Sequence, residues 1–132
     1  MNFKLHHIGC AVKSTQKAID YYTNVLGYEV FEDTFEYPQQ NIKVTFLAMK
    51  DSALLELVEG INEKSPVKKI IDSLGGGTYH MCYEVEDINE AVKYLCKYDF
   101  VQNRKTQMEN DKYKAVYMIT PENYLLELIE MK

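Results

Sequence analysis

An internal repeat is the sequence feature that most constrains this chain. The segment LLELVE at residues 54–59 returns as LLELIE at residues 125–130, a shift of 71 positions. The residues just before it, 43–48, match 114–119 at the same shift. A near-identity of six residues is rare by chance in a chain of 132 residues. We therefore interpret the chain as two copies of one structural module.

Each copy predicts the same order of elements, βαβββ. Alternation of apolar and polar residues indicates strands, and a helical apolar stripe follows the first strand of each copy. The predicted strands lie near residues 4–12, 28–35, 42–49 and 53–59, and near 79–85, 100–106, 113–119 and 124–130. The predicted fold class is α+β, with module one at 1–60, a connecting helix within 61–77 and module two at 78–132.

Local signals place the helices. Capping residues mark the expected start of two helices, and glycines mark the expected end of two. Asp87 with Glu90 forms a capping box, Ser65 precedes Pro66, and a glycine run follows at 75–77. The first helix is expected to bury one apolar stripe, closed by Gly27: Ala18, Ile19, Tyr22, Val25 and Leu26. The equivalent stripe in the second copy is Ala91, Val92 and Leu95.

Composition excludes several classes of protein. The chain has 15 basic and 20 acidic residues and a net charge of −5, which argues against a nucleic-acid partner. No apolar run approaches the ~20 residues that span a bilayer, and the N-terminus lacks the features of a signal peptide. Three cysteines without a CxxC pair are typical of a reduced chain. We expect a cytoplasmic protein with no membrane partner.

The repeat also aligns two of the three histidines, because His7 lies over His80 at a shift of 73. In the last strand of each copy, Glu56 and Glu127 stand between apolar residues. A lone ionised carboxylate in such surroundings costs several kcal/mol, and two near each other repel. A divalent cation removes both costs. The predicted site holds one divalent metal ion, Zn, Ni, Co, Mn or Fe, on these two histidines and two glutamates.

Alternation alone leaves a second interpretation open. Glu56 and Glu127 can instead face solvent, with Glu59 and Glu130 pointing inward. The repeat cannot decide between these faces, because both glutamates of each strand are duplicated. His7, considered alone, is typical of an ordinary core histidine. His6 shares the face of Ile8 and is interpreted as structural or peripheral.

The paired βαβββ pattern, with HHIGCAV, YHMCYEV and LLELIE at its landmarks, resembles the vicinal oxygen chelate superfamily of glyoxalases, epimerases, dioxygenases and drug-binding proteins. The resemblance covers almost the whole chain. It implies a cupped mixed β-sheet with helices on its outer face. It assigns the metal positions to His7, Glu56, His80 and Glu127, and so favours the first of the two glutamate arrangements.

Two branches of the superfamily are nearest. The segment SPVKKIIDSLGGGTYHMCYEVEDINEAVKYL is similar to methylmalonyl-CoA epimerase, and PENYLLELIE is nearer to glyoxalase I, a lactoylglutathione lyase. The resemblance implies a metal-dependent isomerase, epimerase or lyase that removes an α-proton next to a metal-bound carbonyl. Glu127 is the first choice of base and Glu56 its partner. The implied substrate is a small thioester or hemithioacetal.

Other outcomes remain open at this level. Residues 107–112 replace the glycine-rich loop usual in epimerases, which leaves the substrate undecided. A non-enzymatic protein that binds a small molecule or drug in the same cup is the main alternative to an enzyme. Half-open sheets with exposed edges favour pairing between copies, so we expect a homodimer.

Overall fold

The computed structural model describes the backbone of residues 1–132 and every side chain except those at positions 105 and 106. The elements follow the predicted α+β order of two tandem βαβββ modules. The strands are β1 (Lys4–Ala11), β2 (Glu29–Tyr37), β3 (Ile42–Ala48), β4 (Leu54–Gly60), β5 (Gly77–Glu84), β6 (Val101–Glu109), β7 (Tyr113–Ile119) and β8 (Leu125–Met131). The helices are α1 (Thr15–Asn24), η1 (Pro38–Gln40), α2 (Pro66–Leu74) and α3 (Ile88–Cys96). Among the described residues, no helix is both long and apolar enough to cross a membrane.

The chain forms two compact units. The first unit is His7–Tyr79, and the second combines Met1–His6 with His80–Lys132. Contacts rather than chain order define these units, so the first residues of β1 belong with the second copy of the repeat. Each unit contains one complete set of repeat strands, and each is described by itself below.

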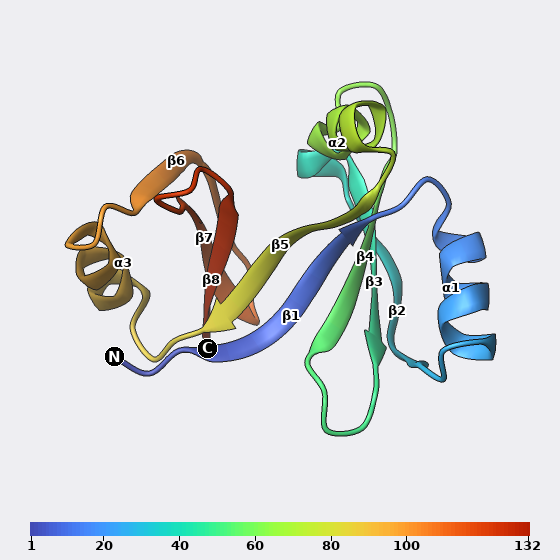
Figure 1. The fold of residues 1–132 in the computed structure, drawn as a ribbon, viewed down its shortest axis with the longest axis horizontal. Coiled ribbons are helices and arrows are strands. Elements are labelled where there is room, and N and C mark those ends of the chain that lie inside the picture. The colour runs from blue at the N-terminus through green and yellow to red at the C-terminus, as the bar shows by residue number, and fades with distance from the viewer. The chain divides into compact units, whose positions relative to one another are not determined.

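The first unit has the strand order β2-β3-β4-β1 (Figure 1). β1 pairs with β4 in parallel, and the other neighbours are antiparallel. Helix α1 covers one face, where its residues Ala18, Ile19 and Tyr22 pack on Cys10 and Leu57. Helix α2 covers part of the opposite face through Val67, Ile70 and Ile71, which pack beside Val44 and Val58.

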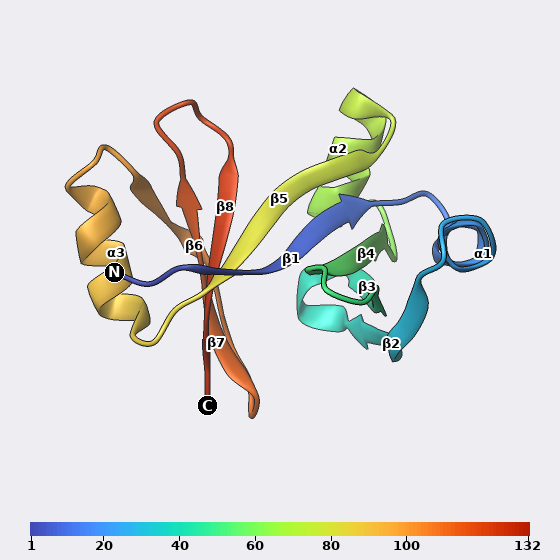
Figure 2. The same ribbon diagram turned by 60° about the horizontal axis from the view of Figure 1, so that its bottom comes forward.

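The second unit repeats this plan with the order β5-β8-β7-β6. β5 pairs with β8 in parallel, and β8–β7 and β7–β6 are antiparallel. Figure 2 shows α3 along one side of this sheet. Its residues Ala91, Val92 and Leu95 pack on Leu128 and Met118, as the predicted stripe requires. The opposite face carries Cys82, Ala115 and Ile129.

The two predicted helix starts, at Ser65 and Asp87, are confirmed, and the structure shows a third capping residue, Ser14. The side chains of Ser14, Ser65 and Asp87 accept hydrogen bonds from the backbone N–H groups of Lys17, Val67 and Glu90. These bonds satisfy N–H groups that have no partner within the helix. The end of α2 is also as predicted, since Gly75 adopts the left-handed conformation (φ 78°) that favours glycine.

The predicted stripe on α1 is wrong at its C-terminal end. Val25 and Leu26 are 77% and 52% exposed rather than packed on the sheet. The regular helix ends at Asn24, and the chain turns back through Gly27 (φ 84°) so that Tyr28 N–H donates to the carbonyl of Tyr22. Val25 and Leu26 lie in this turn and do not continue the helical period. Their side chains therefore do not point toward the face of α1 that packs on the sheet.

Candidate metal centre

The faces of β4 and β8 decide where each duplicated glutamate lies. Leu55 and Leu57 pack on the α1 side of the first unit, whereas Leu54 and Val58 pack on the other side. Because side chains alternate along a strand, Glu56 shares the face of Leu54 and Val58. In β8, Leu128 packs on the α3 side and Ile129 on the opposite side. The same alternation puts Glu127 with Ile129.

In the first unit, His7 and Glu56 form a pair on the face away from α1. Nε2 of His7 lies 3.7 Å from Oε1 of Glu56, with side-chain exposures of 4% and 14%. The strand register sets this contact, because Gly9 of β1 lies opposite Glu56 and leaves room for the imidazole two positions before it. The ring of Phe46, directly across from Glu56 on β3, meets the His7 ring edge-on at 5.4 Å between centroids.

The second unit contains the equivalent pair. Nε2 of His80 lies 3.1 Å from Oε2 of Glu127, with side-chain exposures of 0% and 4%. Cys82 of β5 takes the place of Gly9 opposite the glutamate. Tyr117 of β7 lies across from Glu127 and meets the His80 ring edge-on at 6.0 Å. Each unit therefore holds one imidazole, one carboxylate and one aromatic ring at matching positions of the repeat.

The second glutamate of each strand has a different task that the sequence did not reveal. Glu59 accepts a 2.5 Å hydrogen bond from Thr15 N–H at the start of α1. Glu130 accepts a 2.8 Å hydrogen bond from Ile88 N–H at the start of α3. A negative charge is favourable at a helix N-terminus. The two glutamates of each strand therefore have different roles. The first faces the histidine, and the second accepts a hydrogen bond from the start of the helix.

The environment of Glu59 also changes its acidity. Burial by itself raises the pKa of this carboxyl group, but the hydrogen bonds from Thr15 and Lys43 outweigh burial and lower the pKa overall. Nζ of Lys43 lies 3.2 Å from Glu59, and Nζ of Lys114 lies 3.9 Å from Glu130. The sequence does contain a signal for this helix-holding role. In each strand a second acidic residue follows the first glutamate by three positions, and alternation puts it on the side of the sheet that the helix covers.

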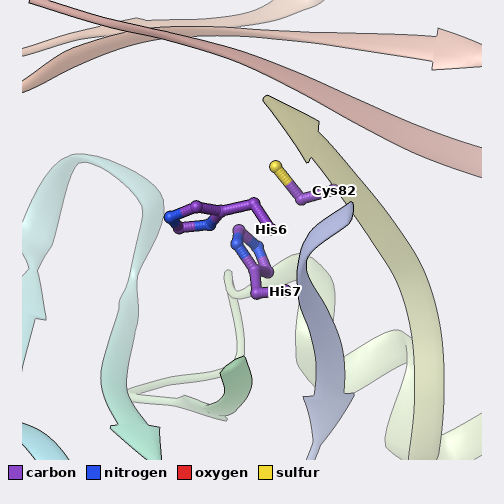
Figure 3. Close-up of side chains that lie close together, drawn as sticks. All are labelled: His6, His7 and Cys82. Carbon is purple, nitrogen blue, oxygen red and sulfur yellow. The ribbon is translucent and has the colours of Figure 1, made fainter. Parts of the chain in front are cut away.

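Figure 3 shows His6 and His7 of β1 with Cys82 of β5. Within the second unit, a ring nitrogen of His6 lies within 4.8 Å of the Cys82 sulfur, and Cys82 is fully buried. Sequence reasoning treated Cys82 only as a small apolar residue and His6 as structural or peripheral. The spacing along the chain gives no signal for this proximity, because it depends on how β1 and β5 run in space.

The donor atoms of each pair fit a transition-metal ion. Two ligands bound at about 2.0 to 2.2 Å, with an angle of roughly 90° to 120° at the metal, lie about 2.8 to 3.8 Å apart. The His–Glu separations of 3.7 Å and 3.1 Å fall in this interval. Imidazole nitrogen and carboxylate oxygen are both common ligands of Zn, Fe, Mn, Co and Ni. All four predicted ligands therefore occupy positions that suit coordination within their own unit.

Comparison with known proteins identifies the family of the chain. Residues 6–117 match the family model of the Glyoxalase/Bleomycin resistance protein/Dioxygenase superfamily. The chain belongs to this superfamily, as its repeat and motifs predict. Members of this superfamily typically use a divalent metal ion.

Among individual relatives, the mitochondrial methylmalonyl-CoA epimerase of Dictyostelium discoideum is 32% identical over 93 residues, covering 70% of this chain and 55% of that protein. The ethylmalonyl-CoA/methylmalonyl-CoA epimerase of Cereibacter sphaeroides is 35% identical over 89 residues, covering 67% of this chain and 65% of that protein. This chain spans about half the length of the mitochondrial epimerases that it matches.

The fold has close counterparts among solved structures. A hypothetical protein from Bacillus halodurans superposes with a TM-score of 0.88 at 25% identity, and the match covers 100% of this chain and 96% of that one. The predicted α+β class with tandem modules is therefore confirmed by the elements and by this likeness.

Proposed function

We propose that this protein is a metal-dependent epimerase that removes and returns the α-proton of a coenzyme A thioester. The proposal assigns one divalent ion to His7, Glu56, His80 and Glu127. The single observation that supports it most is the occurrence of the same buried imidazole–carboxylate pair in both units, at 3.7 Å and 3.1 Å. The relatives that are epimerases of acyl-CoA substrates supply the substrate class.

One shared ion accounts for the chemistry of both pairs better than two separate ions. Protein metal sites of this kind take three or four protein ligands, whereas one pair supplies two. Four ligands from the two pairs complete such a set, and two carboxylates balance the charge of one dication. When bound, the ion would act as a Lewis acid that stabilises negative charge on the carbonyl oxygen of the substrate.

The glutamates carry the proton transfer in this proposal. One carboxylate takes the α-proton, and the electrons of the broken C–H bond pass into the enolate. The second glutamate, which has first gained a proton from water, gives that proton to the opposite face of the carbon and returns to the carboxylate form. The first glutamate then releases its proton to water. The sequence resemblance favours Glu127 as the base and Glu56 as its partner. Glu56 makes the longer contact and is the more exposed of the two. We therefore assign Glu56 the greater freedom to leave its histidine and accept a proton.

The decisive experiment follows the α-proton directly. The protein, with its metal content measured first, is incubated in heavy water with methylmalonyl-CoA, with ethylmalonyl-CoA, and with the hemithioacetal of methylglyoxal and glutathione. Mass spectrometry and NMR then detect deuterium at the α-carbon and the products. Exchange and epimerisation of a CoA thioester are the expected result. Exchange with none of the three substrates, in protein carrying about one ion per chain, would reject the proposal.

The alternatives give different outcomes in the same assay. Conversion of the hemithioacetal to a lactoyl thioester, without exchange in either CoA substrate, would identify a lactoylglutathione lyase. Protein that holds no ion when purified without added metal, and that remains inactive after metal is added, would instead support a small-molecule binding protein.

A further inference from the structure

His6 of β1 and Cys82 of β5 are two metal-binding side chains that the proposed function does not use (Figure 3). A ring nitrogen of His6 lies within 4.8 Å of Sγ of Cys82. Both residues belong to the second unit, although they are far apart in the chain. Imidazole and thiolate are both common metal ligands in proteins. The pair is therefore a candidate for a second metal site, and its ligand types decide which ion it would hold.

The sulfur ligand favours a soft metal ion. Thiolate selects ions such as Cu(I), whereas hard cations such as Mg and Mn prefer oxygen ligands. Among the described residues, the metal-binding group that contains His6 and Cys82 includes no carboxylate. Glu127 lies opposite Cys82 in the strand register, but its carboxylate is in contact with His80. The pair thus offers nitrogen and sulfur without oxygen.

The spacing of the two donor atoms suits an ion with few ligands. With metal–sulfur and metal–nitrogen bonds of about 2.3 and 2.0 Å, the donors lie about 3.5 Å apart at a tetrahedral ion and about 4.3 Å apart when they stand in line. The limit of 4.8 Å on the separation of His6 and Cys82 admits both arrangements. Zn takes three or four protein ligands, and this pair supplies two. Cu(I) has a filled d shell and is stable with two ligands in line.

Burial of the pair favours an ion of single charge. Cys82 is 0% exposed and lies in an apolar cluster with Ala115 and Ile129. Net charge is costly in such surroundings. One thiolate and one Cu(I) ion sum to zero, and a neutral imidazole adds no charge, whereas a divalent ion on the same pair would leave one positive charge. As the sulfur–copper bond forms, the thiol proton passes to water, so the buried group stays neutral.

His6 gives an ion a route to the buried sulfur. Its side chain is half-buried, whereas Cys82 has no exposed surface. The other two cysteines have different settings, since Cys10 of the first unit is hydrogen-bonded to the Tyr22 hydroxyl and Cys96 of α3 is exposed. Among the described residues, Cys82 is the cysteine that lies in a metal-binding group.

We propose that His6 and Cys82 form a copper(I) site, separate from the divalent-ion site on the two His–Glu pairs. The Cys82 thiolate binds the ion, and a ring nitrogen of His6 completes a set of two ligands. The inference does not depend on the proposed function, because it uses neither the glutamates nor the transfer of an α-proton. It implies that the chain separates two kinds of metal by ligand type, with thiolate for a soft monovalent ion and carboxylate for a divalent ion.

The test measures copper(I) binding directly. Metal-free protein is titrated with copper(I) without oxygen, in competition with a chromogenic copper(I) chelator, and the wild type should hold one ion per chain. Cys82→Ser should weaken binding about 100-fold and His6→Asn about tenfold, because each variant removes one of two ligands. The matched control, Cys96→Ser, removes an exposed thiol of the same unit and should keep the wild-type affinity. Unchanged binding in Cys82→Ser, or loss of binding in Cys96→Ser, would overturn the proposal.

X-ray absorption at the copper edge identifies the ligands. The loaded wild type should show one sulfur and one nitrogen neighbour, and His6→Asn should lose the nitrogen. A copper ion bound by two sulfurs, or by nitrogen alone, would contradict the assignment. Thermal unfolding checks that each variant folds. If Cys82→Ser does not fold, His6→Asn still decides the proposal, because it changes a half-buried side chain.

Divalent ions distinguish this site from the metal centre proposed above. Cys82→Ser and His6→Asn should keep the wild-type content of Zn or Mn, since the His–Glu pairs hold these ions. His80→Ala should lose the divalent ion and still bind copper(I). Loss of both kinds of metal in Cys82→Ser would show one common site and reject a separate one. Copper(I) binding as expected, in a chain that takes up no divalent ion, would keep this site and reject the metal centre.

Discussion

At the scale of residues, the same two side-chain types recur in two different settings. His80 and Glu127 are almost fully buried and 3.1 Å apart, whereas Glu56 is 14% exposed and 3.7 Å from His7. The aromatic partner also differs, since Phe46 in the first unit corresponds to Tyr117 in the second. The two pairs therefore share their residue types but differ in burial and in the distance between imidazole and carboxylate.

The glutamate roles give the first prediction. Glu127→Gln and Glu56→Gln should each lower kcat by about 10²- to 10⁴-fold, because an amide of equal size cannot accept the α-proton. Steady-state assays on the thioester identified by deuterium exchange measure this change. Glu122→Gln, at an exposed turn position, is the matched control and should keep wild-type kcat. Full activity in both site variants would show that neither glutamate is the base.

At the scale of elements, each strand that carries a candidate metal ligand also holds the start of a helix. Glu59 is three residues after Glu56 on β4 and holds the first N–H of α1, and Glu130 stands in the same relation to Glu127 and α3. A strand with period two puts such residues on opposite faces. The strand that carries the candidate ligand therefore also fixes the position of the helix start relative to the sheet.

The lowered pKa of Glu59 gives a pH-dependent prediction. Because folding lowers this pKa below its usual 4.5, the charged carboxylate stabilises the folded state fully above that value. The contribution is lost as the pH falls through the lowered, folded-state pKa. Glu59→Gln should lower the unfolding free energy by about 1 kcal/mol at pH 7, since the charge at the helix start is lost.

Urea unfolding at pH 7 and near pH 3 measures this effect. The difference between wild type and Glu59→Gln should be present at pH 7 and shrink as the pH falls below 4.5 and through the lowered, folded-state pKa of Glu59. Glu29→Gln, at an exposed position of β2, is the control and should show little difference at either pH. A difference that stays constant with pH would show that charge is not the source of the stabilisation.

At the scale of the whole molecule, one shared ion would couple the two units. His7→Ala removes a ligand of the first unit and His80→Ala a ligand of the second. Each variant should fall from about one ion per chain to almost none and lose the thermal stabilisation that metal gives the wild type. Mass spectrometry of the metal and thermal unfolding with and without a chelator measure both effects. A fall from two ions to one would show that each pair binds its own metal.

Exposed sheet edges give the last prediction. β2 and β6 each lie at an edge of the sheet in their own unit, and Phe31 and Val101, one on each strand, are both 63% exposed. Unpaired edges with apolar side chains favour association, so we expect a homodimer of about twice 15.4 kDa. Light scattering after size exclusion measures the mass, and Phe31→Glu should shift it toward the monomer. A wild-type monomer at micromolar concentration would contradict this expectation.

The sequence by itself determined the modules, the order of elements and two of the helix starts, and it narrowed the candidate ligands to two histidines and one of two glutamates in each copy. These follow from local periodicity, from capping chemistry and from the repeat, all of which act over a few residues or compare equivalent ones. Only the tertiary structure decided which duplicated glutamate faces its histidine and which holds a helix, because alternation alone permits both faces. It also decided that α1 stops before Val25, and that His6 and Cys82 come together in the second unit. Such contacts depend on the pairing of distant strands, which no local pattern records.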